Sequence, residues 1–451
     1  MAENKEMDET RNLSTAPIYF EDLNKKLSDR LEKQISSMPS SNCSIYRVPR
    51  KFFIIGEEDT YTPRVISIGP YHHGKQHLKA FEQFKIWYLH SFISRSPDTH
   101  LSDYVNAIRK IETSIRECYT EPIELSSDDF VRTMVLDGCF ILELLNKYQE
   151  EDSKMDSKDC LFKSTWTVPS LRRDLVLLEN QVPFILLDHL FNLSMCRKNS
   201  LSLSELILNF FDPILPSILV TSKDHSFKGK HVLDLLRNYL LFPYQAIEDT
   251  PICKYTGEVT IFQPSEVIYF GDSPMWEYIT CAMSLQKAGV KFKRKDTANG
   301  LLDITFRNGI VEMPPFCVGE SWTILFPNLI ALEQCRRDYP DKITSYVILM
   351  NRLINSRKDV KLLCNTGIID GLYMKDEKVV RVIDKICEEV IVDNFYYDGL
   401  CNKINAYCRR RRNKWGASLK KVHSRIPWQG FFFVALLTLF LLTVAEIIRS
   451  D

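Results

Sequence analysis

Three histidines that lie close together are the first candidates for chemistry in this sequence. His72, His73 and His77 fall within SIGPYHHGKQH, and His73 and His77 would form an i, i+4 metal-binding pair if a helix began early. No third ligand follows at a metal-site spacing, and Pro70 and Gly74 make the beginning of the segment a turn. We therefore favour a structural turn whose imidazoles bond backbone carbonyls, and we predict no metal and no cofactor.

Two carboxylates, Asp174 and Glu179, are the candidates for acid–base chemistry. They lie in LRRDLVLLENQVPFILLDHL, five residues apart, so they do not share one face of a helix. A catalytic pair would need partners from elsewhere in the chain. Because Pro183 removes a backbone donor, we interpret Glu179, Asn180 and Gln181 as a polar kink inside an apolar core, with their side chains bonded to freed backbone groups.

Nucleophilic and phosphate-binding chemistry has no support in the sequence. It contains no G-x-S-x-G, G-x-x-x-x-G-K-[ST], G-x-G-x-x-G or H-E-x-x-H pattern, so we predict no catalytic residue. The 13 cysteines are odd in number and form no C-x-x-C pair. Several, such as Cys139, lie inside apolar runs. This pattern is typical of reduced, buried thiols in a cytosolic protein.

Basic residues gather near the C-terminus, although the chain as a whole has 58 basic and 58 acidic residues. We predict that anionic lipid is contacted by Arg409, Arg410, Arg411, Arg412, Lys414, Lys420, Lys421 and Arg425. A nuclear-localisation or nucleic-acid patch is the alternative. The rest of the chain is mildly acidic, which argues against a nucleic-acid binder, and we predict none as a partner.

An uncharged apolar stretch follows the basic residues, from Ile426 to Ala445. About 20 helical residues cover the ~30 Å hydrocarbon core of a bilayer, so we predict a single-pass membrane helix. Its membrane-contacting side chains would be Trp428, Phe431, Phe432, Phe433, Leu436, Leu437, Leu439, Phe440, Leu441, Leu442 and Ile447. The positive-inside bias would keep the bulk of the chain cytosolic, at the plasma membrane or an endomembrane. A buried helix of a soluble core is the alternative.

Helical periodicity dominates the elements that must position these residues. The spacing of apolar residues predicts helices at 77–94, 101–118, 127–148, a kinked helix at 171–190, and helices at 273–287, 322–337, 343–354, 360–363, 377–390 and from 395 onward. We divide the chain into a polar extension at 1–44, a mostly helical domain at 45–400, a basic segment at 401–427 and a membrane helix at 428–448.

The β signal is confined to two regions. Val65 to Ile68 could form a short strand before the Gly69-Pro70 turn. Alternation at 290–295 and 301–307, followed by Asn308-Gly309 and 310–313, predicts a three-stranded meander. The predicted fold is therefore mainly α: a large helical domain with a small antiparallel β meander and one C-terminal transmembrane helix.

Several blocks together resemble a plant-specific family catalogued as domain of unknown function 247. They are, in order, IYRVP, SIGPYHHG, VLDGCFILELL, RRDLVLLENQVPF, AGVKF with LLDITF, NLIALEQC and ITSYVILMNRLINS. The resemblance extends from Ile45 to the end, with EMPPF departing from the smoother strand common in the family. It implies a plant protein, a mostly helical fold and a C-terminal membrane span, and it supplies no catalytic residues. Some relatives are implicated in pollen–stigma self-incompatibility in grasses, which implies recognition or signalling.

Three functional hypotheses remain open on the sequence alone. The first is a membrane-anchored, non-enzymatic interaction or signalling protein with protein partners of unknown identity. The second is an enzyme of unfamiliar class with a site near the 174–181 and 72–77 segments. The third is a lipid-responsive scaffold whose basic segment binds phosphoinositides.

Overall fold

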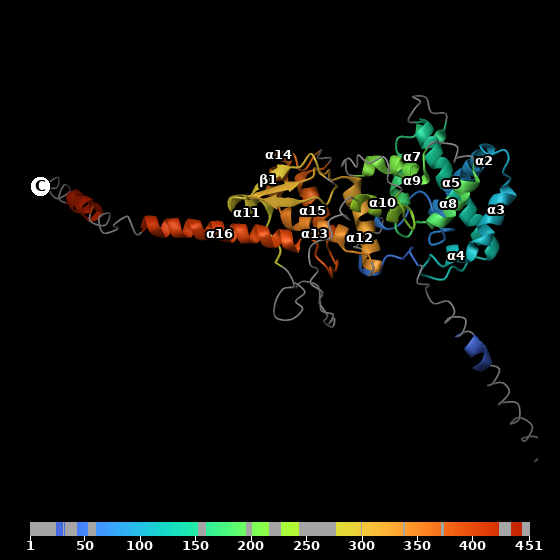
Figure 1. Ribbon diagram of the computed structural model, residues 1–451, viewed down its shortest axis with the longest axis horizontal. Coiled ribbons are helices and arrows are strands. Elements are labelled where there is room, and N and C mark those ends of the chain that lie inside the picture. Colours follow the sequence, from blue (N-terminus) through green and yellow to red (C-terminus); the bar gives the residue numbers. More distant parts are fainter. Residues whose placement is uncertain are drawn as a thin grey trace, which may run out of the picture. The chain divides into compact units, whose positions relative to one another are not determined.

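The computed structural model divides the chain into two compact units. Unit 1 comprises 1–213 and 225–239, and unit 2 comprises 214–224 and 240–451. The described residues are 24–29, 31, 43–52, 60–151, 159–194, 201–215, 227–242, 277–298, 300–336, 339–370, 374–423 and 434–443; the side chains of 151 and 412–423 are not described. Figure 1 shows these residues coloured along the sequence.

Unit 1 is helical. Its elements are η1 (Arg50–Phe52), η3 (Gln76–Phe81), α2 (Glu82–Ser94), α3 (Leu101–Lys110), α4 (Glu112–Arg116), α5 (Ser127–Glu151), α6 (Cys160–Lys163), α7 (Thr167–Leu175), α8 (Phe184–Leu193) and α9 (Leu203–Phe211), with η5 (Asp212–Ile214) and α10 (Val232–Leu241) at its sequence boundaries. Predicted helices at 77–94 and 127–148 are confirmed, whereas 101–118 is divided at Ile111.

Helix α5 is the centre of unit 1, as its nearly continuous apolar character predicts. It packs against α2, α3, α8 and α9 (Figure 1). Phe130, Met134 and Phe140 are completely buried. At Gly138 a Cβ atom would lie 2.4 Å from Leu190 Cδ1, so the glycine permits the close approach of α8.

The predicted kinked helix at 171–190 is wrong. Helix α7 ends at Leu175, residues 176–183 are not helical, and α8 begins at Phe184 with Pro183 as its N-cap. Proline suits a position just before a helix because the missing N–H is one that the first turn would leave unbonded. The polar residues at 179–181 therefore lie in a connection between two helices.

Unit 2 combines helices with a small sheet. Its elements are α11 (Ala282–Lys287), β1 (Lys291–Arg294), β2 (Thr305–Arg307), β3 (Ile310–Met313), η7 (Ser321–Leu325), α12 (Phe326–Cys335), α13 (Lys342–Leu353), α14 (Arg357–Asn365), α15 (Asp376–Ile386) and α16 (Asp398–His423). The helix predicted from 273 begins at Ala282 instead, and Ser273 lies outside the described residues. Trp322, Phe326 and Tyr346 pack together in its core.

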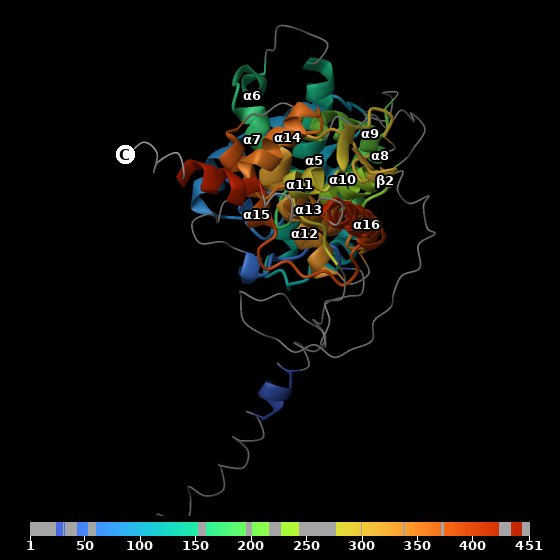
Figure 2. The same cartoon turned by 90° about the vertical axis from the view of Figure 1, so that its left-hand side faces the viewer.

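The sheet has the order β1-β3-β2, so the predicted antiparallel meander is wrong in one pairing. Strands β2 and β3 are antiparallel around Asn308-Gly309, whose φ angles of 51° and 81° suit a tight hairpin turn. Strand β1 instead pairs with β3 in parallel, Lys291 opposite Ile310. Helix α16 packs on β2 within this unit (Figure 1, Figure 2).

The predicted transmembrane helix is also wrong. Among the residues that the structure describes, no helix is long and apolar enough to cross a membrane. The described apolar helix covers 434–443, and at ~1.5 Å per residue it extends about 15 Å, roughly half of the hydrocarbon core.

Candidate functional site

The segment 64–69 of unit 1 runs from the exposed Arg64 into the core, where 66–69 are buried, and no described strand pairs with it. Asp174, at the end of α7, accepts hydrogen bonds from three of its successive N–H groups. Its Oδ2 atom lies 3.0 Å from Arg64 N, 2.7 Å from Val65 N and 3.0 Å from Ile66 N. The predicted strand at this segment is absent, and a carboxylate takes the place of a neighbouring strand.

Asn180 and Asp137 continue the same pattern. The Asn180 amide accepts from Ile68 N at 2.7 Å and donates to Ile66 O at 3.0 Å. Asp137 Oδ2 accepts from Gly69 N at 2.8 Å. Both side chains are almost completely buried. Because a buried backbone group without a partner is costly, these side chains hold the segment in place.

Lys85 links the Oδ1 atom of Asp137 to the backbone of the segment 64–69. Its Nζ atom lies 2.6 Å from Asp137 Oδ1, 2.5 Å from Ser67 O and 2.7 Å from Glu82 Oε1. Burial would lower the pKa of this ammonium group, but Asp137 and Glu82 outweigh burial and raise it. Sequence reasoning missed Lys85, although a cation on the buried stripe of α2 was a usable signal.

Glu179 binds the beginning of the domain. Its Oε1 accepts from Val48 N at 2.9 Å, while Oε2 lies 3.2 Å from His72 Nε2 and 3.4 Å from Arg47 Nη1. Burial would raise the pKa of Glu179, but His72, the Val48 amide and Arg47 lower it below its usual value. Burial lowers the pKa of His72, against the opposing effect of Glu179.

The histidine turn does not form the helical metal pair. Residues 71–74 form a turn, and η3 begins only at Gln76, after His73. His77 Nε2 lies 3.3 Å from Pro63 O, the carbonyl contact that the sequence indicated. Throughout the described ranges, no group of three His, Cys, Asp or Glu side chains is placed to hold a metal ion.

The predicted polar residues of unit 1 bond mainly to backbone groups. The Asp174 carboxylate accepts from N–H groups of the segment 64–69. The Glu179 carboxylate accepts from the N–H of Val48. Gln181 donates to Leu175 O at 2.7 Å and Leu177 O at 2.9 Å. The network that the sequence predicted at 179–181 is present. Its side chains are buried and bond mainly to backbone N–H and C=O groups.

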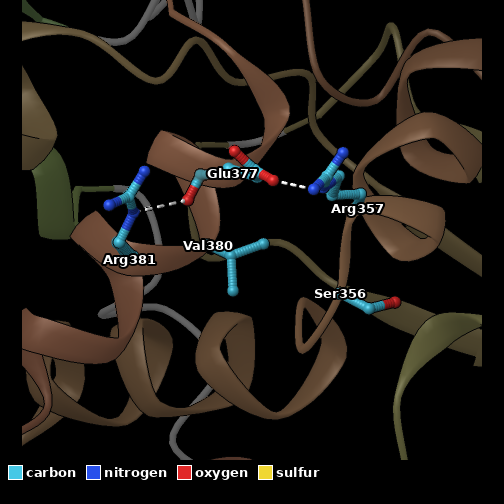
Figure 3. Close-up of a pocket in the computed structure, with 5 residues that line it drawn as sticks. All are labelled: Ser356, Arg357, Glu377, Val380 and Arg381. Atoms are coloured by element: carbon cyan, nitrogen blue, oxygen red, sulfur yellow. Dashed lines mark hydrogen bonds and ion pairs between the residues drawn. The ribbon is translucent and has the colours of Figure 1, made fainter.

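A shallow pocket in unit 2 is a separate candidate (Figure 3). It has a volume of about 410 Å³ and is lined by Ser356, Arg357, Glu377, Val380 and Arg381. Arg357 forms an ion pair with Glu377, and Arg381 Nε donates to Glu377 O at 3.4 Å. Figure 3 shows the two arginines on either side of the glutamate. The pocket is open, and its acid is already paired, so it offers no assembled catalytic group.

The basic residues predicted to contact lipid are partly described. Arg409, Arg410 and Arg411 are exposed on α16, and the side chains of Arg412, Lys414, Lys420, Lys421 and Arg425 lie outside the described residues. Arg409 forms an ion pair with Glu277 at 3.0 Å. Arg411 donates to the neutral acceptors Tyr407 Oη at 3.0 Å and Gly289 O at 3.4 Å. Among the residues that the structure describes, no carboxylate pairs with Arg411.

The apolar residues beyond α16 are also partly described. Helix 434–443 exposes the side chains of Leu436, Leu437, Leu439, Phe440, Leu441 and Leu442, each between 54% and 67% accessible. Trp428, Phe431, Phe432, Phe433 and Ile447 lie outside the described residues. Contiguous exposed apolar side chains of this kind are unusual on the surface of a soluble protein.

Comparison with known proteins gives a family but no activity. Residues 45–442 match the family described as plant protein of unknown function, DUF247. The chain is 30% identical to UPF0481 protein At3g47200 of Arabidopsis thaliana, over 91% of this chain and 87% of that one. It is 22% identical to putative UPF0481 protein At3g02645 of the same plant, over 99% and 95% of the two chains. No solved structure matches.

Proposed function

The chain belongs to the DUF247 family of plant proteins of unknown function, and we propose that it is a non-enzymatic interaction protein held at an anionic membrane surface by the C-terminal part of unit 2. The proposed contact is with the headgroups and the adjoining acyl boundary, without a span. The folded units would then be available to protein partners at that surface.

One observation carries the proposal: an exposed apolar helix follows a helix with exposed arginines. Helix 434–443 has every described side chain exposed, and Arg409–Arg411 are exposed on α16. Apolar side chains bind the headgroup–acyl boundary, while Lys and Arg bind anionic headgroups at about 1 kcal/mol each. An acidic protein partner would account only for the arginines, and an apolar one only for the helix. An anionic lipid surface accounts for both features.

The polar core of unit 1 supports the non-enzymatic part of the proposal. Asp174, Asn180, Asp137 and Lys85 are engaged with the backbone of 64–69 or with one another. Acid–base catalysis needs a group that can reach a substrate proton. Groups that hold a core segment are not available for that task.

Flotation of the purified full chain with lipid vesicles tests the proposal. We expect binding to phosphatidylcholine vesicles that contain phosphatidylserine, and at least about tenfold weaker binding to phosphatidylcholine alone, because two or more cations would lose their partners. The triple variant Leu436→Asn, Leu439→Asn, Phe440→Asn should lose most binding, since each buried methylene contributes about 0.8 kcal/mol.

A matched variant separates this effect from a general loss of apolar surface. Leu101 and Ile391 are 44% and 47% accessible and lie outside helix 434–443. Leu101→Asn with Ile391→Asn should leave flotation unchanged. Equal binding of the wild type to both kinds of vesicle, or normal binding of the triple variant, would contradict the proposal.

A further inference from the structure

Two exposed cations from separate strands flank one residue of β3. Lys291 of β1 and Arg307 of β2 are both paired in register with Ile310. Directly opposed residues point to the same face of a sheet, and strands lie about 4.8 Å apart, so the two cations are about 10 Å apart on one face. The following row, which includes Phe292 and Val311, faces the core.

A third cation lies at the same end of the sheet. The Arg411 guanidinium rests against Gly289, where a Cβ atom would lie 2.4 Å from Cζ. Tyr407, which accepts from Arg411, packs on Phe306 and on Gly309. The two glycines therefore let α16 place a cation beside the beginning of β1. We call Lys291, Arg307 and Arg411 the sheet-end patch.

The charge of the sheet-end patch is not balanced by nearby acids. In the described part of unit 2, none of its three members forms an ion pair, and all three are exposed. The acid on the same sheet face, Glu312, is already bonded to Lys293 at 2.9 Å. That bond lowers the pKa of Glu312, with Lys295 and Arg307 adding to the effect. The face therefore retains a positive excess.

We propose that the sheet-end patch is a second contact with the anionic bilayer and that it turns this face of the sheet toward the headgroups. Charge complementarity identifies the partner as anionic lipid, and α16, which contributes Arg411, also carries the exposed Arg409 and Arg410. Ile310, which lies between the two cations, is half-buried. The surface between them is therefore shallow and suits a planar array of headgroups. This inference rests on the function proposed above.

Flotation of a double variant tests the inference. Lys291→Gln with Arg307→Gln removes two charges from the sheet-end patch and disturbs no ion pair. At about a fivefold loss per cation, binding to phosphatidylserine-containing vesicles should fall roughly 25-fold. The matched control is Lys361→Gln with Lys378→Gln, which removes two exposed, unpaired charges elsewhere in unit 2. Charges more than a Debye length of about 10 Å from the lipid should have less than a twofold effect.

The outcomes separate this inference from the proposed function. Loss of binding in the sheet-end variant, with the control binding like the wild type, supports the inference. If the wild type binds and the two double variants bind equally well, the sheet-end patch is not a lipid contact and only this inference fails. If the wild type binds no anionic vesicle, the proposed function fails and this inference fails with it.

Discussion

At the scale of single residues, buried polar groups in unit 1 determine how the chain folds back on itself. His231 shows this well: it is completely buried, its Nε2 lies 2.9 Å from Ser44 O, and its Nδ1 lies 3.3 Å from Asp234 N. The first contact requires a proton on Nε2 and the second requires a lone pair on Nδ1. Only the neutral imidazole with its proton on Nε2 makes both contacts. This tautomer therefore joins the beginning of the domain, at Ser44, to α10.

The protonation of His231 should therefore make the protein less stable in acid. Burial lowers the pKa of His231 in the folded chain, against the opposing effect of Asp234. Above the unfolded-state pKa of about 6.5 its contribution is fully present, and it is lost as the pH falls through 6.5 toward the folded pKa. We expect the free energy of unfolding, from urea denaturation at pH 7.5 and 5.5, to decrease by up to about 1.4 kcal/mol per pH unit for this group.

Two substitutions isolate that contribution. His231→Gln removes the titrating group and should flatten the pH dependence, even though it lowers stability at pH 7.5. His90→Gln, at an exposed position on α2, should leave the pH dependence as in the wild type. An unchanged slope in the His231 variant would show that other groups, such as His72, carry the acid sensitivity.

At the scale of elements, the segment 64–69 depends on its contact with the connection between α7 and α8. Gly69 has φ +72°, and a Cβ atom there would lie 2.4 Å from the backbone oxygen of Gln181. Backbone cannot move aside as a flexible side chain can. Gly69→Ala should therefore lower the free energy of unfolding by more than about 3 kcal/mol, because a clash adds to the ~1–2 kcal/mol cost of a left-handed alanine.

Gly74 provides a matched control in the same turn region. Its φ is +79°, but a Cβ atom there would meet nothing within 4 Å. Gly74→Ala should thus cost only the conformational term of about 1–2 kcal/mol in urea denaturation. Equal losses in the two variants would mean that the approach of Gln181 is unimportant to the segment.

Local patterns in the sequence predicted local structure, and their failures involve distant partners. Periodicity predicted α5, and Asn308-Gly309 predicted the β2–β3 hairpin. The parallel pairing of β1 with β3 could not be read from alternation, which identifies a strand without identifying its neighbour. The Pro183 signal predicted a disturbance, but a kink and a break look alike until the partners of Asn180 and Gln181 are known.

The candidate residues were predicted unevenly for the same reason. A satisfied network at 179–181 followed from polar residues within an apolar run. The partners of Asn180, Ile68 N and Ile66 O, come from more than 100 residues away. The sheet-end patch was missed because Lys291 and Arg307 become neighbours only through the register of β3. The apolar run at 426–445 predicted a span, yet the described helix is too short for one.

At the scale of the whole molecule, two kinds of surface should contribute to membrane binding with different sensitivity to salt. Exposed cations such as Arg410 and those of the sheet-end patch act over a Debye length of about 10 Å at 0.1 M salt, which shortens to about 3 Å at 1 M. Apolar burial by helix 434–443 is not screened. Flotation of the full chain on phosphatidylserine-containing vesicles should therefore decrease with added salt to a residual level.

That residual level should belong to helix 434–443. The triple variant at Leu436, Leu439 and Phe440 should bind weakly at low salt and not at all at 1 M, because only its electrostatic contact remains. The double variant at Lys291 and Arg307 should start lower than the wild type and converge with it at high salt, where both depend on the same apolar helix. Two curves that stay parallel at all salt concentrations would mean that Lys291 and Arg307 do not act through charge, and would contradict a contact between this face of the sheet and anionic headgroups.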